Sequence, residues 1–278
     1  MPAMESGFIA VPGGRLYYEA DGAGHPLLLI PGGLGSLRMW DEHVPAFVER
    51  YQVIRFDPRG YGDTETDNVE FSNRADAAAV LEQLGAQSAH VVGQSRGGHI
   101  GLDLSIERPE LVDALVLVAA GASGYEPQLP AGVEPVPWDE MERLWESKDW
   151  TALAELETRV WVDGWGQPAT RVDAELRQRV HDEILQTYLA QKEEAQPQPL
   201  QPPAVGRLGE VKAPLLVVIG SVDEPGGNLN ARFVAESVAG ARLVEFEGPA
   251  HMVHLEQPVR FNELVLEFLA EVDATHGR

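Results

Sequence analysis

Short apolar runs that alternate with helical patterns constrain the fold of this 278-residue chain more than any other feature of its sequence. Continuous apolar runs are typical of strands that are buried on both faces of a parallel sheet. They occupy residues 27–30, 53–56, 89–92, 115–119 and 215–219, and a further strand pattern lies at 242–246. Helical patterns cover 73–84, 97–107, 230–238 and 258–272, after an N-terminal hairpin at 8–11 and 16–20. Strands that alternate with crossover helices predict an α/β fold with a doubly wound, mostly parallel sheet.

Residues 122–205 interrupt this alternation. Helical patterns occupy 138–146, 151–162 and 173–195, and a Pro/Gln tract at 196–203 has the composition of an exposed connector. We therefore predict a core domain built from residues 1–121 and 206–278. A helical cap made of residues 122–205 is predicted to be inserted between two strands of that core.

The predicted cap contains five of the six tryptophans of the chain. A helix buries one face, so these aromatic side chains can simply pack the cap against the core. They can also line an apolar pocket between the cap and the sheet. The candidates for such a pocket are Trp138, Trp145, Trp161 and Trp165.

Composition excludes several classes of function. The formal net charge of −23 is unsuited to nucleic acid or to an anionic membrane, because both carry negative charge. The longest apolar run, near residues 115–120, is too short to span a bilayer, and the N-terminus has no secretory signal, so we expect a cytoplasmic protein. The chain has no cysteine and no metal-binding or dinucleotide-binding motif, so we expect neither a metal nor a cofactor.

Ser95 lies in the motif Gly93-Gln94-Ser95-Arg96-Gly97, between the strand pattern 89–92 and the helical pattern 97–107. A G-x-S-x-G motif in this position predicts a sharp strand-to-helix turn, on which glycines two residues either side of the serine avoid steric clashes. A serine hydroxyl becomes a nucleophile when a base removes its proton and backbone donors stabilise the oxyanion. The motif therefore predicts that Ser95 is a nucleophile.

The strand 27–30 is followed by Pro31-Gly32-Gly33-Leu34-Gly35, which resembles the oxyanion loop of the α/β-hydrolase family. Together with the Ser95 motif, this loop makes the chain similar to that family over nearly its whole length. The resemblance is nearest to capped esterases and enol-lactonases, although Pro31 replaces the usual histidine of the oxyanion loop. It implies that the backbone N–H groups of Gly33 and Arg96 form the oxyanion hole. For the Arg96 side chain we expect an ion pair with a nearby carboxylate, or alternatively recognition of an acidic substrate group.

The same resemblance implies a base and an acid, in the chain order nucleophile, acid, histidine. His251 stands at the position of the family's catalytic histidine, in the loop after the last strand, with His254 as its competitor. Asp223 stands after the strand 215–219, where the family places its acid, and the adjacent Glu224 is the alternative. The predicted catalytic residues are Ser95, Asp223 and His251.

The predicted function is a serine hydrolase that cleaves a small, apolar ester or lactone through an acyl-enzyme. The same three residues also serve C–C bond hydrolases and cofactor-free haloperoxidases or perhydrolases, so these activities stay open as alternatives. A ligand receptor with this fold and little turnover is the alternative from another class. The expected partner is a small molecule.

Overall fold

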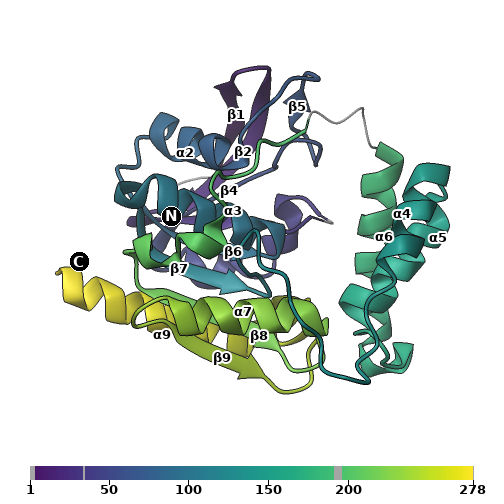
Figure 1. Ribbon diagram of the computed structural model, residues 1–278. Coiled ribbons are helices and arrows are strands. Elements are labelled where there is room, and N and C mark those ends of the chain that lie inside the picture. The colour runs from purple at the N-terminus through teal and green to yellow at the C-terminus, as the bar shows by residue number, and fades with distance from the viewer. Residues whose placement is uncertain (1–3, 34, 191–195, 278) are drawn as a thin grey trace.

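The protein is a twisted, mixed β-sheet with helices on both faces and a further group of helices to one side (Figure 1). The computed structural model describes residues 4–33, 35–190 and 196–277. The strands are β1 (Glu5–Val11), β2 (Gly14–Gly22), β3 (His25–Ile30), β4 (Tyr51–Phe56), β5 (Glu65–Thr66), β6 (Ala89–Gln94), β7 (Val112–Val118), β8 (Leu215–Gly220) and β9 (Arg242–Phe246). Their order in the sheet is β1-β2-β4-β3-β6-β7-β8-β9, with β5 paired to β2. The neighbouring strands in the row β4-β3-β6-β7-β8-β9 are all parallel. The pairings made by β1, β2 and β5 are antiparallel.

The sheet is covered on both faces because its central strands carry apolar side chains on both sides. In β3, Leu28 and Ile30 belong to one apolar cluster, whereas Leu27 and Leu29 belong to a second cluster on the opposite face. The first cluster includes α2 (Asn73–Gln83), α3 (Arg96–Glu107) and α7 (Pro225–Ser237). The second includes α1 (Val44–Phe47) and α9 (Pro258–His276). The predicted α/β-hydrolase fold with a mostly parallel sheet is confirmed.

The segment between β7 and β8 forms a separate layer of helices beside the sheet (Figure 1). We name residues 138–190 the helical layer. It comprises α4 (Trp138–Ser147), α5 (Trp150–Glu157), a π-helical turn (Thr158–Val162) and α6 (Ala174–Ala190). Its own apolar cluster includes Leu153, Val160 and Ile184, and extends to Met252 and Leu255 next to the sheet.

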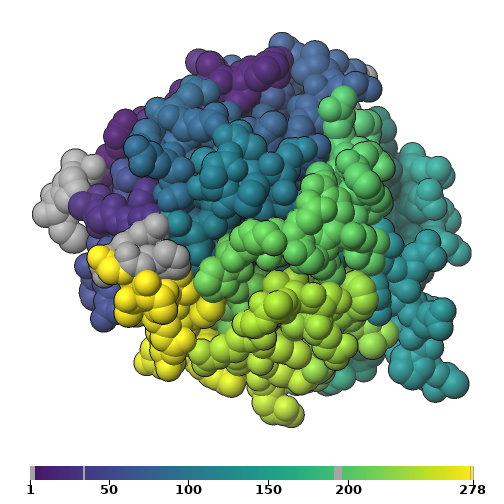
Figure 2. Space-filling model, turned by 60° about the vertical axis from the view of Figure 1, so that its left-hand side comes forward, coloured from purple at the N-terminus to yellow at the C-terminus, as the bar shows by residue number. Residues whose placement is uncertain are grey.

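Two expectations about this segment need correction. The helix predicted over 151–162 is α-helical to Glu157 and continues as a π-helical turn over Thr158–Val162. In this turn the Asp163 N–H donates to the Thr158 carbonyl, five residues back instead of four. The connector at 196–203 is not exposed throughout: Leu200 is buried in the cluster that covers the first face of the sheet. Figure 2 shows this green segment crossing the surface on its way back to the core. Residues 191–195, which we expected to be helical, lie outside the described residues.

Most other element boundaries agree with the prediction within a few residues, but α7 begins at Pro225 rather than at residue 230. Glu224 causes this earlier start, because its carboxylate accepts hydrogen bonds from the Gly226 and Gly227 N–H groups at the helix N-terminus. Within the described part of the chain, no helix has the length and apolar character needed to cross a membrane.

Candidate active site

Ser95 lies on a strained turn between β6 and α3, with backbone angles φ 50° and ψ −116°. Its N–H donates to the Val118 carbonyl at 2.8 Å, which ties the turn to β7. Both flanking glycines are sterically required. A Cβ at Gly93 would lie 2.3 Å from the Gly97 carbonyl oxygen, and one at Gly97 would lie 2.2 Å from the Ile30 carbonyl oxygen. The motif is therefore a close-packed turn that holds the serine between strand and helix.

His251 and Asp223 come together from the loops that follow β9 and β8. The Nδ1 atom of His251 lies 2.9 Å from Asp223 Oδ2 and 3.1 Å from Oδ1. Both residues are buried, and Asp223 Oδ1 also accepts a hydrogen bond from the Glu224 N–H at 2.7 Å. The carboxylate thus has a defined orientation and directs the remaining ring nitrogen of His251, Nε2, away from itself.

Ser95 and His251 line the same two cavities, at the boundary between the sheet and the helical layer. The first cavity, of about 170 Å³, is bordered by Gly33 from the core and by Glu157 and Trp161 from the helical layer. The second, of about 340 Å³, shares Ser95, Trp161 and His251 with the first and extends to His99, Trp138 and Glu224. Ser95 and His251 therefore lie where the walls of the two cavities are shared.

This arrangement has several features that acyl transfer uses. An imidazole held at Nδ1 by a carboxylate can accept a serine proton at Nε2. Gly33 lies on the wall of the first cavity, and Arg96 is the first residue of α3, where backbone N–H groups and the helix dipole favour negative charge. Leu34, within the same loop as Gly33, lies outside the described residues.

Comparison with known proteins assigns the chain to a family. A family model described as the alpha/beta hydrolase fold matches residues 25–258. The chain belongs to this family. It is 31% identical to a 2-hydroxy-6-oxononadienedioate/2-hydroxy-6-oxononatrienedioate hydrolase of Paraburkholderia phymatum, over 92% of this chain and 91% of the relative.

Solved structures extend the comparison to the fold of the whole chain. An enol-lactonase from Burkholderia xenovorans LB400 matches with a TM-score of 0.76 and 21% identity, covering 95% of this chain and 100% of that structure. An esterase from Exiguobacterium antarcticum matches with the same TM-score and 22% identity, covering 95% and 98%. The recognition of the α/β-hydrolase family from its motifs is confirmed, as is the coarser functional prediction of a hydrolase.

The alternatives to His251 and Asp223 occupy other places in this α/β-hydrolase. His254 is fully buried against Trp40 and His43, and burial, followed by the nearby histidines, lowers its pKa well below the ordinary value. It lines neither cavity. Glu224 borders the second cavity, but its carboxylate caps α7 and has no contact with His251 among the hydrogen bonds of the described residues.

The expected ion pair of Arg96 is wrong. Its guanidinium carbon lies 4.1 Å from the centre of the Tyr61 ring, as in a cation–π contact, and no carboxylate of the described residues pairs with it. Its Nε and Nη2 atoms are buried without a hydrogen-bond partner. The Arg96 side chain is absent from the lining of both cavities.

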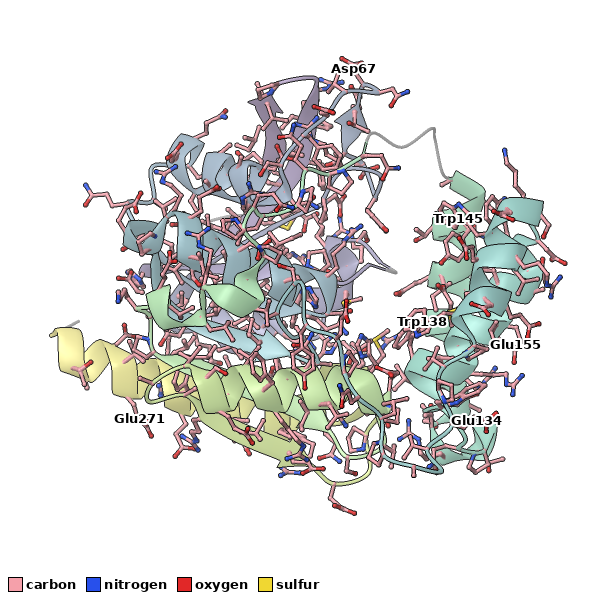
Figure 3. The ribbon with its side chains drawn as sticks, viewed as in Figure 1. Asp67, Glu134, Trp138, Trp145, Glu155 and Glu271 are labelled. Atoms are coloured by element: carbon pink, nitrogen blue, oxygen red, sulfur yellow. The ribbon has the colours of Figure 1, made fainter. Side chains whose placement is uncertain are left out.

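The four candidate tryptophans separate into two groups. Trp161 borders both cavities, and its ring centre is 4.8 Å from that of His251; Trp138 borders the second cavity and contacts Trp161. Trp145 lies at the opposite end of α4 from Trp138 (Figure 3). It packs against Trp150 and Tyr188, and Trp165 lies near Arg159. Neither Trp145 nor Trp165 lines the two cavities.

Two ionisable residues of the pocket were missed by the sequence analysis. Glu157 borders the first cavity, and burial raises its pKa to about 7. His99 borders the second cavity, and its burial, followed by the charge of His251, lowers its pKa to about 4, so that it is neutral at physiological pH. Neither residue lies in a recognisable motif: Glu157 is one of many acidic residues in amphipathic helices, and His99 follows the Ser95 motif only as part of a helical pattern.

Proposed function

We propose that the protein is a serine hydrolase that cleaves a carboxylic ester or lactone of a small molecule through an acyl-enzyme intermediate. The observation that carries the proposal is the hydrogen bond between His251 Nδ1 and Asp223, combined with the position of His251 and Ser95 on the walls of the same cavities. These contacts match the roles of base, orienting acid and nucleophile.

In this mechanism, Ser95 Oγ attacks the ester carbonyl carbon while His251 Nε2 accepts its proton. The N–H groups of Gly33 and Arg96 stabilise the negative charge on the carbonyl oxygen. His251 then donates the proton to the leaving alkoxide, which departs as an alcohol, and the acyl group stays on Ser95. A water molecule deprotonated by His251 attacks the acyl-enzyme, releases the carboxylic acid and regenerates Ser95.

The charge of the pocket favours this reaction over C–C cleavage of a dicarboxylate. The Paraburkholderia relative is named as the hydrolase of a dioate, and such a substrate favours cationic partners for its carboxylates. The described residues that line the two cavities include the acidic Glu157 and Glu224, but no lysine or arginine. An ester or lactone without negative charge fits this lining.

The helical layer completes the proposed active site as a cap. It supplies Glu157, Trp138 and Trp161 to the walls of cavities that otherwise belong to the sheet domain. We therefore retain residues 122–205 as the proposed cap, inserted between residues 1–121 and 206–278.

Replacing Ser95 with Ala tests the proposal. We expect hydrolysis of p-nitrophenyl acetate to fall by at least about 10⁴-fold in kcat, because the variant lacks the attacking atom. A fluorophosphonate probe should label the wild-type protein and not the variant. Hydrolysis by the variant at the wild-type rate would contradict the assignment. Absence of both labelling and turnover in the wild-type protein would favour a receptor.

A panel of substrates separates the other reactions that these residues support. Short-chain esters, lactones and vinylogous diketones are compared at equal concentration, with and without hydrogen peroxide. We expect ester or lactone hydrolysis to dominate. Preferential cleavage of the diketones would identify a C–C hydrolase instead, and peroxide-dependent formation of peracid would identify a perhydrolase.

A further inference from the structure

Glu157 is a carboxyl group placed in the first cavity by the helical layer. It is the last residue of α5, directly before the π-helical turn that carries Trp161, and it borders the cavity together with Ser95 and His251. The Tyr188 hydroxyl on α6 donates a hydrogen bond to Glu157 Oε2 at 2.5 Å. Among the described residues, no hydrogen bond occupies Oε1. One carboxylate oxygen is therefore held in place while the other is free to contact a ligand.

Among the described residues, no cationic side chain forms an ion pair with Glu157. No lysine or arginine is among the described residues that line the first cavity, and Trp161 and Met252 contribute apolar surface. The pKa of Glu157 rises to about 7 because burial penalises the ionised form, and the Tyr188 hydrogen bond opposes this rise only in part. A largely enclosed carboxyl without a cationic partner is costly when ionised, so a cation beside it would lower that cost.

A cationic ligand group would provide the missing partner. An ammonium group forms charge-assisted hydrogen bonds with a carboxylate, and its charge is also attracted to the face of an indole ring such as that of Trp161. A substrate carboxylate would be repelled by Glu157. The net charge of −23 further favours the approach of cations to the protein.

We propose that the first cavity binds an ammonium group of the substrate, held by the carboxylate of Glu157 beside Trp161. The proposal rests on the proposed function, because it takes the substrate to be an ester or lactone that Ser95 attacks. It adds a substrate class: esters that carry a protonated amine a few bonds from the reacting carbonyl.

Three esters that differ in one terminal group test the proposal by turnover. Phenyl 3-aminopropanoate carries an ammonium group where phenyl butanoate carries a methyl group and phenyl hydrogen butanedioate carries a carboxylate. The measured quantity is the ratio of kcat/KM for the ammonium ester to kcat/KM for the methyl ester. Glu157→Gln should lower this ratio about tenfold or more and should raise kcat/KM for the carboxylate ester. Glu142→Gln, an exposed site on α4, is the matched control and should leave both quantities unchanged.

The position of the amine relative to the ester bond requires a second pair of substrates. Dimethylaminoethyl acetate carries its cation on the alcohol side, and 3-methylbutyl acetate is its neutral counterpart. A Glu157→Gln effect confined to this pair would assign the first cavity to the alcohol group, whereas an effect confined to the phenyl esters would assign it to the acyl group. Unchanged ratios in both series would overturn the proposal.

Calorimetric titration with butylammonium chloride tests binding without turnover, and so separates this inference from the proposed reaction. The wild-type protein and Ser95→Ala should both bind the cation, and Glu157→Gln should bind it at least about tenfold more weakly. Such a result would support the ammonium site even if none of the esters were hydrolysed. Equal binding by wild-type and Glu157→Gln proteins, or no binding by either, would overturn it even if Ser95 proved to be the nucleophile.

Discussion

The sheet core and the helical layer contribute to the pocket in different ways. The core supplies Ser95, Asp223 and His251 from turns at the carboxyl ends of parallel strands, where backbone hydrogen bonds and close contacts at glycines restrict their positions. The helical layer supplies Glu157 and Trp161 from helices that pack mainly against one another. Under the proposed function, the core would perform the reaction and the helical layer would select the substrate.

The acid of the proposed triad gives the largest expected contrast, because Asp223 and its neighbour Glu224 differ in their contacts. Asp223→Asn should reduce kcat by about 10⁴-fold, since an amide no longer selects the productive tautomer of His251. Glu224→Gln removes the charge of a helix cap that borders the second cavity but does not contact His251, and should change kcat less than about threefold. Steady-state kinetics on p-nitrophenyl acetate measure both values. Equal losses in the two variants would show that Asp223 is not the orienting acid.

The fold and the positions of the core residues were predictable because they depend on local patterns. Strands buried on both faces appear in the sequence as uninterrupted apolar runs, and residues that follow parallel strands meet at one edge of the sheet. Ser95 and Asp223 each follow such an apolar run, and His251 follows the mixed strand pattern at 242–246. Their proximity therefore follows from the order of the strands.

The contacts of the helical layer were not predictable, because they depend on how helices rotate and pack. Trp145 and Trp161 both lie in amphipathic segments, yet only Trp161 reaches the cavities. The π-helical turn after Glu157 has no distinct sequence pattern. The contact of the Arg96 side chain also depends on tertiary structure. Its stacking on Tyr61 involves a loop about 35 residues away in the chain, which the local sequence does not predict.

Arg171 joins the two regions, so its replacement should weaken their contact. Its guanidinium donates to the carbonyl of Asp163 in the helical layer, and to Glu256 and the carbonyl of Gly248 in the core. Glu256 also accepts a hydrogen bond from the N–H of Ala250, next to the proposed base. Arg171→Met should lower the free energy of unfolding by about 3 kcal/mol, because it leaves a largely buried carboxylate without its partner.

The control for this change is Arg143→Met, which breaks an exposed pair with Glu140 on α4 and should cost less than about 0.5 kcal/mol. Thermal and denaturant unfolding of both variants provide the comparison. A loss for Arg171→Met as small as that of the control would mean that the contacts of Arg171 contribute little to holding the two regions together.

The raised pKa of Glu157 predicts a pH-dependent stability that originates in the helical layer. The folded protein holds this proton up to about pH 7, whereas the unfolded chain releases it near its ordinary pKa of 4.5. Between these values the folded state binds more protons, so stability decreases as pH rises through that window. Glu157→Gln removes the ionisable group and with it this pH dependence. The stability of the variant relative to the wild type should therefore be about 2 kcal/mol higher at pH 8.5 than at pH 5.5.

Asp57 and Asp103 also have pKa values raised by burial to about 6, so they add to the pH dependence of stability. We therefore compare the unfolding of three proteins at the two pH values: the wild type, Glu157→Gln and the exposed control Glu142→Gln. These two carboxyl groups are common to all three proteins, and their effects cancel in the differences. An identical pH dependence for Glu157→Gln and the wild-type protein would show that Glu157 is ionised in the folded state at low pH as well.

Two tryptophans of the helical layer provide the most direct comparison between packing and substrate contact. Trp161→Leu should lower kcat/KM about tenfold for aromatic esters, because it removes an aromatic wall that both cavities share beside His251. Trp145→Leu alters a cluster with Trp150 and Tyr188, so it should change stability but alter kcat/KM less than about twofold. Kinetics and thermal unfolding of both variants separate the two effects. Trp145→Leu could instead lower kcat/KM as much as Trp161→Leu. In that case kcat/KM would depend on the packing of the whole helical layer rather than on the residues that border the cavities.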